Sequence, residues 1–539
     1  MNKNDKRKQQ EEYRILMEKK KRRLQKNRTR QPQVQPQKAL VKEAAIRKKK
    51  QKKNEKKRRI SQNLGVILVI IQLVISIIFI GVVLRLNILP FKYVAIIGIL
   101  LLLLLIGVFV SQIRSKKKCI SGKVASIFFS IILLFGSYYI VKSNSALFDI
   151  TGGNKKVDSI VVAVKTKDAA KKLQDAKDYT FGVQYAMGGD NIEAAVNTIN
   201  KELGTDVNTK ECESIGKQAD ELFAGKVEAI VYNSAYTAML EEEIEGFSDK
   251  TRIIYTHKIE IEVDNEGNGI KVQKEPFSVF ISGIDVYGDI TTNSRSDVNI
   301  IATVNPKTHQ VLLITTPRDY YVPIPGISGD KKDKLTHAGI YGVDASMATL
   351  GQVYDMGIDF YARINFTSLI DIVNALGGVD VESEYAFTTS KDSGVVMDVK
   401  KGMNTFNGEQ ALAFSRERQN LADGDNQRGK DQQAVIKGLI NKMISPSALM
   451  GANKLIDSVR GNVDTNMAAK QIQSLIKQQL SEQSPWNIYS VAAEGTGDKQ
   501  YCYSYKGKPL YVCQPDQTSV DKIKGLVDAV ENGETLPAE

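Results

Sequence analysis

The sequence predicts an α/β protein with a membrane anchor of three transmembrane helices near its N-terminus. Three long apolar runs, at residues 64–84, 93–110 and 124–141, predict the anchor. Beyond residue 155, short β-type runs alternate with helical patterns, which is typical of α/β domains. We therefore expect a small α/β domain followed by a larger α/β domain, a mixed sheet flanked by helices.

A basic tail, residues 1–60, precedes the anchor. It holds 25 Lys and Arg against 6 Asp and Glu, although the whole chain has a net charge of +13. This composition predicts a disordered or loosely helical segment that is attracted to anionic lipid. The charge would also suit nucleic acid, but no aromatic or helix-turn-helix pattern accompanies it, so nucleic acid is not an expected partner.

The anchor, residues 61–142, also predicts an orientation. Each apolar run is about as long as a helix must be to cross a bilayer. Basic residues crowd the end of the tail and the loop between runs two and three, whereas the loop between runs one and two holds only Arg85 and Lys92. We therefore expect a multi-pass protein of the cell membrane with a cytoplasmic tail and an extracellular part after the third run. The long polar tail argues against a cleavable signal peptide.

Residues 155–265 are expected to form an extracellular accessory domain. Strand-like runs at 158–164 and 227–232 alternate with helical patterns at 191–203 and 213–224. These residues contain no catalytic constellation, so we expect either a rigid spacer above the membrane or a ligand-binding domain.

Four cysteines in so long a chain do not make a disulfide scaffold. Cys502 and Cys513 flank a stretch that reads as two short strands around a turn. Such a hairpin would bring the two sulfurs together, and an oxidising compartment would let them form a disulfide. Cys212 has no evident partner and is expected to be a free thiol.

The larger domain, residues 276–539 with a C-terminal extension, carries the polar motifs. Strands are predicted at 298–304 and 311–316, joined by a turn. If they form an antiparallel hairpin, residues whose numbers add up to about 615 face each other. Asp297 and Arg318 then lie opposite one another at the open end of the hairpin.

A second polar cluster follows. Residues 411–418 read as a strand, in which Arg416 and Arg418 share a face because side chains alternate. Arg428 and Gln432 are four residues apart at the start of a predicted helix, a spacing that places both on one side. The helix start also favours an anion through its free N–H groups and its dipole.

These residue types indicate phosphate chemistry. Arginine presents forked donors that bind phosphate oxygens in pairs and keeps its charge at any relevant pH. Asp285, at the end of a buried-type strand, and Asp297 supply the hard oxygen ligands that Mg²⁺ prefers. Phosphoryl transfer needs mainly positioning and charge neutralisation, so arginines and a metal ion are sufficient for it.

The order of the motifs is more specific than any one of them, and it resembles the catalytic domain of the LytR-CpsA-Psr (LCP) family. The resemblance is strongest over residues 276–449, and the anchor and accessory domain make the chain similar to the CpsA-like branch with three transmembrane helices. The motifs are Gly283-Ile-Asp285, Arg295-Ser-Asp297, Asn305-Pro-Lys307, Pro317-Arg318-Asp319, Lys334-Leu-Thr-His-Ala338, Ser415-Arg-Glu-Arg418, Asp425, Arg428 and Asp431-Gln-Gln433.

The resemblance implies a phosphotransferase that moves a glycopolymer, such as capsule or teichoic acid, from a polyprenyl-pyrophosphate carrier to a peptidoglycan hydroxyl. Capsule or wall-polymer synthesis machinery is a further expected partner. The implied pyrophosphate ligands are Arg295, Arg318, Arg416, Arg418, Arg428 and Gln432. Of these, Arg318, Arg416 and Arg418 would be catalytic together with Asp425.

The implied cofactor is Mg²⁺, or Mn²⁺, held by Asp285 and Asp297. Asp425 would be the base for the acceptor hydroxyl, although Asn426 follows it where family members often have Phe. The polyprenyl tail needs an apolar slot, for which the predicted helix at 368–376 and the predicted strand at 395–397 are candidates. His337 is expected to make local hydrogen bonds rather than to bind zinc.

Two other functions remain open from the sequence. Water in place of the sugar hydroxyl would make the same site a polyprenyl-(pyro)phosphate hydrolase. A non-enzymatic membrane regulator of polysaccharide synthesis would bind the lipid-linked polymer outside and signal through the tail. A regulator of transcription would need a DNA-binding domain, for which the sequence has no pattern.

Overall fold

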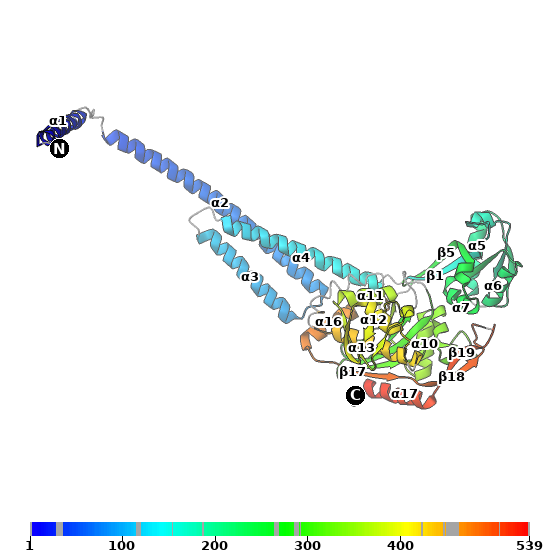
Figure 1. Ribbon diagram of the computed structural model, residues 1–539. Helices are drawn as coiled ribbons and strands as arrows, with labels where there is room; N and C mark the ends of the chain where they lie inside the picture. Colours follow the sequence, from blue (N-terminus) through cyan, green and yellow to red (C-terminus); the bar gives the residue numbers. More distant parts are fainter. Residues whose placement is uncertain are drawn as a thin grey trace. The chain divides into compact units, whose positions relative to one another are not determined.

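Figure 1 shows the computed structural model of the chain. It describes residues 3–28, 36–114, 120–152, 155–185, 188–262, 269–284, 290, 293–421, 424–445, 448, 463–505 and 507–536. The chain divides into two compact units, one of residues 1–77 and 99–133, the other of residues 78–98 and 134–539.

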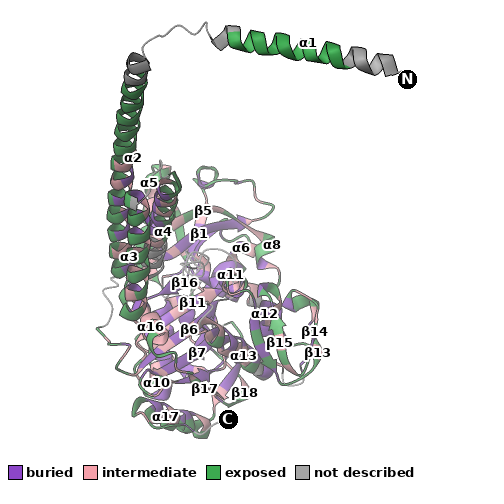
Figure 2. Cartoon of the chain, turned by 90° about the vertical axis from the view of Figure 1, so that its left-hand side faces the viewer, coloured by how far each residue is buried: buried purple, intermediate pink, exposed green. Residues whose placement is uncertain are grey.

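Long helices make up the N-terminal part. They are α1 (Lys3–Arg28), α2 (Pro36–Leu86), α3 (Phe91–Arg114) and α4 (Ile120–Gly152). The last three are long and apolar enough to cross a membrane, and each contains one of the predicted runs. Most of their apolar side chains are exposed, as the green colour of α2 and α3 in Figure 2 shows, and this is the pattern of helices that face lipid.

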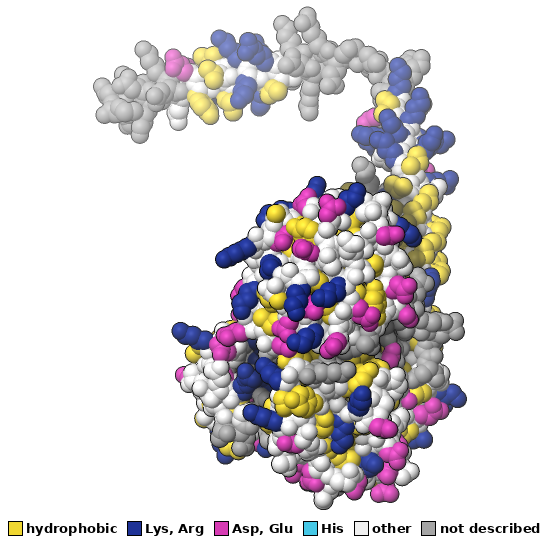
Figure 3. Space-filling model, turned by 90° about the vertical axis from the view of Figure 1, so that its right-hand side faces the viewer, with side chains coloured by type: hydrophobic (Ala, Val, Ile, Leu, Met, Phe, Trp, Pro, Cys, Tyr) yellow, Lys and Arg dark blue, Asp and Glu magenta, His cyan; other side chains and the backbone are white. Residues whose placement is uncertain are grey.

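The first unit has a small core of its own, in which Val69 of α2 packs with Leu105 and Val108 of α3. The tail that we expected to be disordered or loosely helical is helical over its described residues. In Figure 3, Lys and Arg line α1 and the first part of α2, whereas acidic and basic side chains are mixed on the visible face of the folded part.

A five-stranded sheet with the order β3-β2-β4-β1-β5 follows the anchor. Strand β1 runs antiparallel to its two neighbours, β4 and β5, and β2 runs parallel to β3 and β4. The strands are β1 (Lys155–Lys165), β2 (Thr180–Val183), β3 (Asn208–Glu211), β4 (Ala229–Asn233) and β5 (Thr251–Glu262), and the helices are α5 (Gly189–Leu203), α6 (Ile215–Phe223), α7 (Thr237–Glu243) and α8 (Phe247–Lys250).

A six-stranded mixed sheet with the order β16-β11-β6-β7-β8-β17 forms the centre of the larger domain. The β7–β8 hairpin pairs Ile300 with Thr315 and continues to Asn305 with Gln310, which confirms the predicted register. The strands are β6 (Phe277–Ile284), β7 (Ser296–Asn305), β8 (Gln310–Thr315), β11 (Phe360–Asn365), β16 (Val463–Thr465) and β17 (Asn487–Ala492).

Helices cover both faces of this sheet because successive side chains of a strand point to opposite faces. Ile300 of β7 packs in one apolar core under α11 (Phe366–Ala375), α12 (Gly408–Arg416) and α13 (Asp425–Met443). Ile301, the next residue, packs in another core under α10 (Val343–Tyr354) and α17 (Gln517–Glu531). Figure 2 shows the central strands as buried. The predicted α/β class with a mixed sheet is confirmed.

Smaller elements surround this framework. They are β9 (Tyr321–Pro323), β10 (Lys332–Lys334), α9 (Leu335–Ala338), the 3₁₀ turn η3 (Gly339–Tyr341), β12 (Val379–Ser383), β13 (Phe387–Thr388), β14 (Asp398–Val399), β15 (Gly402–Phe406), α16 (Ala469–Glu482), β18 (Gly495–Gln500) and β19 (Leu510–Pro515).

The prediction of a strand at residues 411–418 is wrong, because these residues belong to helix α12 and the turn after it. Asn407 and Gln410 begin the helix with a capping box, in which each side chain accepts a hydrogen bond from the other residue's backbone N–H at 3.0 Å. Ala411, Leu412, Phe414 and Ser415 are then buried together. Arg416 and Arg418 therefore do not share a strand face.

The predicted disulfide between Cys502 and Cys513 is also absent, since both are free, buried thiols. Strands β18 and β19 do form a hairpin, but its register places Cys513 opposite Gly497. Cys502 lies in the connecting loop, beyond the last paired residues, so the ladder does not bring the two sulfurs together. Cys212 is a free thiol, as expected.

Candidate active site

The predicted phosphate ligands meet at one edge of the six-stranded sheet. Strands β6, β8 and β11 end there and β7 begins there, so the loops of four strands converge on one place. A pocket of about 380 Å³ opens between them. Its polar lining residues are Arg295, Asp297, Arg318, Asn365, Ser390, Asp392, Ser393, Ser415, Arg416, Arg418, Gln419, Arg428 and Gln432, and its apolar ones include Ile284, Val298, Ile364, Phe366, Leu369 and Leu412.

Asp297 and Arg318 form an ion pair in the pocket, as the hairpin register predicted. The Nη1 atom of Arg318 lies 3.1 Å from Oδ2 of Asp297. Ile284 and Gly283 of β6 pair with Ser296 and Val298, so Asp297 is the extra residue of a β-bulge. A bulge changes the direction of a side chain at a sheet edge, and here the bulged residue, Asp297, lines the pocket.

The carboxyl group of Asp297 is held as an anion. Burial alone would raise its pKa, but the charges of Arg318 and Arg295, a hydrogen bond from Thr336 and the charge of Arg428 together lower it below the usual value. The Thr336 hydroxyl donates that bond to Oδ1 at 2.9 Å. A half-buried, ionised carboxylate among arginines is suited to balance their charge and to orient their side chains.

The arginines of the second cluster are positioned in different ways. The guanidinium of Arg416, at the end of α12, lies over the Phe366 ring at 4.4 Å from its centroid, a cation–π contact that fixes the plane of the fork. Arg418 is exposed in the following turn. That turn is held by the buried carboxylate of Glu417, which accepts hydrogen bonds from the backbone N–H groups of Arg418 and Gln419.

Helix α13 contributes Arg428 and Gln432, which both line the pocket as their spacing predicted. Gln432 also donates a hydrogen bond to the Ser415 carbonyl at 3.3 Å, which joins α13 to the end of α12. Asp285 lies outside the described residues, and so does the side chain of Asp425, the first residue of α13. The predicted metal ligand Asp285 and the predicted base Asp425 therefore remain predictions.

The structure thus brings all six predicted pyrophosphate ligands and Asp297 to one pocket. Phe366, Thr336 and Glu417 contribute to the site but were missed. Thr336 and Glu417 stand inside motifs that the sequence offered, whereas Phe366 follows a strand from another part of the chain. Leu369 of the predicted helix at 368–376 lines the pocket, whereas residues 395–397, the other candidate for the polyprenyl slot, are not part of its lining.

Asp431 of α13 predicts a pH dependence of stability. Burial raises its pKa to about 7, despite a hydrogen bond that the carboxylate accepts from Gln427 at 3.0 Å. Because the folded state holds a proton that the unfolded state releases near pH 4, stability should fall as the pH rises toward 7 and then level off, by at most about 1.4 kcal/mol per pH unit. Asp431→Asn should remove this slope in denaturation series of the full chain at pH 5 to 8. The exposed Asp330→Asn should keep it, and an unchanged slope in Asp431→Asn would contradict the assignment.

The sequence model of the LytR_cpsA_psr family matches residues 236–525, more than half of the chain. The chain belongs to the LytR-CpsA-Psr family. It is similar to polyisoprenyl-teichoic acid–peptidoglycan teichoic acid transferase TagU of Enterococcus faecalis, with 34% identity over 236 residues that cover 43% of this chain and 75% of the relative.

TagT of Bacillus subtilis, a transferase with the same descriptive name, is 32% identical over 258 residues, 47% of this chain and 76% of the relative. Among solved structures, Bacillus subtilis TagV has 28% sequence identity and a TM-score of 0.41, and the match covers 49% of this chain and 99% of that one. In this member of the LytR-CpsA-Psr family the matched region includes every described pocket residue.

Proposed function

We propose that this protein transfers a glycopolymer from a polyprenyl-pyrophosphate carrier to a hydroxyl of peptidoglycan, with formation of a phosphodiester. The observation that carries the proposal is the lining of the pocket, which combines several arginines with apolar side chains. The five arginines and Gln432 suit a pyrophosphate, and the apolar side chains of the same pocket suit the start of a polyprenyl chain. The printed names of TagU and TagT describe teichoic acid transfer to peptidoglycan, and we carry that chemistry to this chain.

In the proposed reaction the acceptor hydroxyl oxygen forms a bond to the phosphorus that carries the glycan. The bond from this phosphorus to the bridging oxygen breaks, and polyprenyl phosphate leaves with that oxygen. The hydroxyl proton passes to a base, for which Asp425 is our candidate. Arg318 and Arg416 would hold the charge that develops on the phosphate oxygens.

Asp297 fits a divalent cation by its chemistry, since it is an anionic carboxylate in reach of the pocket. We propose that it holds Mg²⁺, or Mn²⁺, together with Asp285 and the substrate phosphates. The ion would neutralise pyrophosphate charge and favour the leaving group. We further propose the orientation from the charges of the loops, with the tail in the cytoplasm and the catalytic domain outside.

The test uses the full chain in detergent with a synthetic polyprenyl-pyrophosphate oligosaccharide and peptidoglycan fragments, and mass spectrometry of the products. A Mg²⁺-dependent phosphodiester adduct is expected, and Arg416→Ala should reduce it at least about 100-fold. The exposed Lys400→Ala should leave it unchanged. Free polyprenyl phosphate without an adduct would replace the proposal by the hydrolase, and binding without either product would favour the regulator.

A further inference from the structure

The segment that delivers Arg295 to the pocket is fixed at both of its ends. At the later end, the Ser296 hydroxyl lies 2.8 Å from that of Ser282 on β6. At the earlier end, the buried side chain of Asn293 donates a hydrogen bond from Nδ2 to Oδ1 of Asp158 at 2.8 Å. Arg295 lies between these two fixed residues, so the backbone path of residues 293–296 determines the direction in which its side chain leaves the chain.

Asp158 belongs to the five-stranded sheet, 135 residues earlier in the chain. It stands on β1, the strand that pairs with both β4 and β5, and it faces Ile259 of β5. Its second oxygen accepts a hydrogen bond from the side chain of Asn191 at 2.5 Å. At Asp158 the strand is paired with β5 alone, since its pairing with β4 begins at Ile160. This pairing and the hydrogen bond from Asn191 hold the carboxylate in place as an acceptor for Asn293.

The same segment packs closely against η3. A Cβ atom placed on Gly339 would lie 2.6 Å from the carbonyl oxygen of Ser294 and 2.7 Å from the backbone nitrogen of Ser296. Only glycine allows this approach, because any side chain would push the two backbones apart. The segment of residues 293–296 therefore contacts η3 as well as Asp158.

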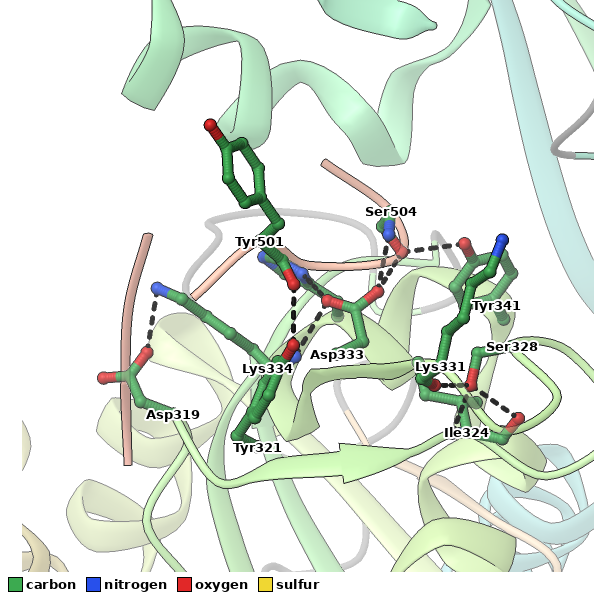
Figure 4. A network of polar contacts seen from close by, with 11 residues as sticks. Asp319, Tyr321, Ile324, Ser328, Lys331, Asp333, Lys334, Tyr341, Tyr501 and Ser504 are labelled. Carbon is green, nitrogen blue, oxygen red and sulfur yellow. Dashed lines mark hydrogen bonds and ion pairs between the residues drawn. The ribbon is translucent and has the colours of Figure 1, made fainter. Parts of the chain in front are cut away.

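A buried polar network holds η3 in turn, and Figure 4 shows its centre. The Tyr341 hydroxyl lies 2.8 Å from that of Ser504, and the Ser504 backbone N–H donates to Oδ2 of Asp333 at 2.8 Å. Oδ1 of Asp333 lies 2.6 Å from Nδ1 of His337. Both carboxylate oxygens thus have protein partners, which confirms the expected local hydrogen bonding of His337.

This network also meets the five-stranded sheet. Tyr236, which follows β4, packs in one apolar core with Ile340 of η3 and with Cys502. The pKa of its hydroxyl is raised first by burial and then by the nearby Tyr341 and Asp158. Tyr236 and Tyr341 therefore lie near Asp158, the residue that holds Asn293.

We propose that Asp158 is a positioning residue for the active site: by holding Asn293 it sets the backbone path of residues 293–295 and so directs Arg295 to the pyrophosphate. This gives the accessory domain a role in substrate binding at a distance from its own sheet. The part that concerns the pyrophosphate rests on the proposed function, whereas the anchoring of the segment does not.

The test compares hydrogen exchange of the peptide that contains residues 293–297 with the affinity for geranylgeranyl pyrophosphate, both on the full chain in detergent. Asp158→Ala should raise exchange of this peptide about tenfold and leave the core of β7 protected. It should weaken pyrophosphate binding about three- to tenfold. Asp158→Asn, which keeps an acceptor oxygen, should stay within about twofold of the native chain.

Two further comparisons make the positioning role specific. Asn293→Ala should reproduce Asp158→Ala, and the double variant should be no worse than either, because both remove one interaction. In an Arg295→Ala background, Asp158→Ala should have no further effect on affinity. Asp220→Asn, which removes an exposed carboxylate of the same domain, serves as the control.

Unchanged exchange in Asp158→Ala, or additive effects of Asp158→Ala and Asn293→Ala, would overturn the proposal. So would a loss of affinity that persists in the Arg295→Ala background. Raised exchange in a protein whose native form does not bind the pyrophosphate would support the anchoring and overturn the proposed function instead, so the two failures are distinguishable.

Discussion

Arg318→Ala should reduce glycopolymer transfer by on the order of 1,000-fold, the range in which a charge-stabilising arginine acts in phosphoryl transfer. The variant removes the guanidinium that is 3.1 Å from Asp297 and lines the pocket. It also leaves a carboxylate in partial burial without its nearest positive charge, so the pKa of Asp297 should rise. Both changes reduce the ability of the pocket to hold a pyrophosphate.

Arg318→Lys distinguishes the contribution of the positive charge from that of the planar, two-pronged guanidinium group. Lysine keeps one positive charge but cannot bind two oxygens in a plane, so it should restore only part of the lost activity. Arg363→Ala is the matched control, because Arg363 pairs with Asp464 at 3.4 Å in the same sheet but outside the pocket. It should lower the melting temperature without a comparable loss of transfer. Equal losses of activity in Arg318→Ala and Arg363→Ala would mean that Arg318 only stabilises the fold.

The ion pair of Asp297 and Arg318 was predictable because an antiparallel hairpin has a register that its turn determines. Once the turn at residues 305–309 was recognised, the pairing at the other end of both strands followed. The sequence did not predict the bulge at Asp297, since a single unpaired residue leaves no pattern in hydrophobicity. The hairpin therefore identified the partners but not the turn of the carboxylate into the pocket.

Helix α12 shows why short apolar runs mislead. Residues 411–415 are too few to separate a period of two from a period of 3.6, and the capping residues Asn407 and Gln410 lie outside the run. The error changed the predicted support of Arg416, which lies over Phe366 rather than beside Arg418. The prediction that these arginines line one pocket is nevertheless correct. It was based on the chemistry of the residues and did not depend on which element carries them.

Contacts between residues far apart in the chain could not be predicted from the sequence. Asp158 and Asn293 are ordinary polar residues, and nothing near either predicts the other. The same holds for Ser504 and Asp333, which are 171 residues apart. Such pairs depend on how two sheets and a C-terminal loop pack together, which local patterns do not encode.

Asp297→Asn should have opposite effects on substrate binding in the absence and in the presence of Mg²⁺. The amide has the same shape as the carboxylate but removes a negative charge from a pocket of arginines. Without metal, pyrophosphate should bind as tightly as to the native chain or more tightly, because like-charge repulsion is lost. The increase in pyrophosphate affinity that Mg²⁺ gives the native chain should be largely absent in the variant. The Mg²⁺ concentration for half-maximal transfer should rise at least about tenfold.

Calorimetric titrations of the full chain with geranylgeranyl pyrophosphate, with and without Mg²⁺, would measure both effects. Asp464→Asn, the partner of Arg363 outside the pocket, is the matched control and should change neither titration. If Asp297→Asn weakens binding equally with and without metal, Asp297 acts only by orienting Arg318, and the metal site must be built from other groups. If instead the two titrations diverge as expected, the carboxylate of Asp297 binds the metal. Arg318 then orients a metal ligand, and pairing with Arg318 is not the sole role of Asp297.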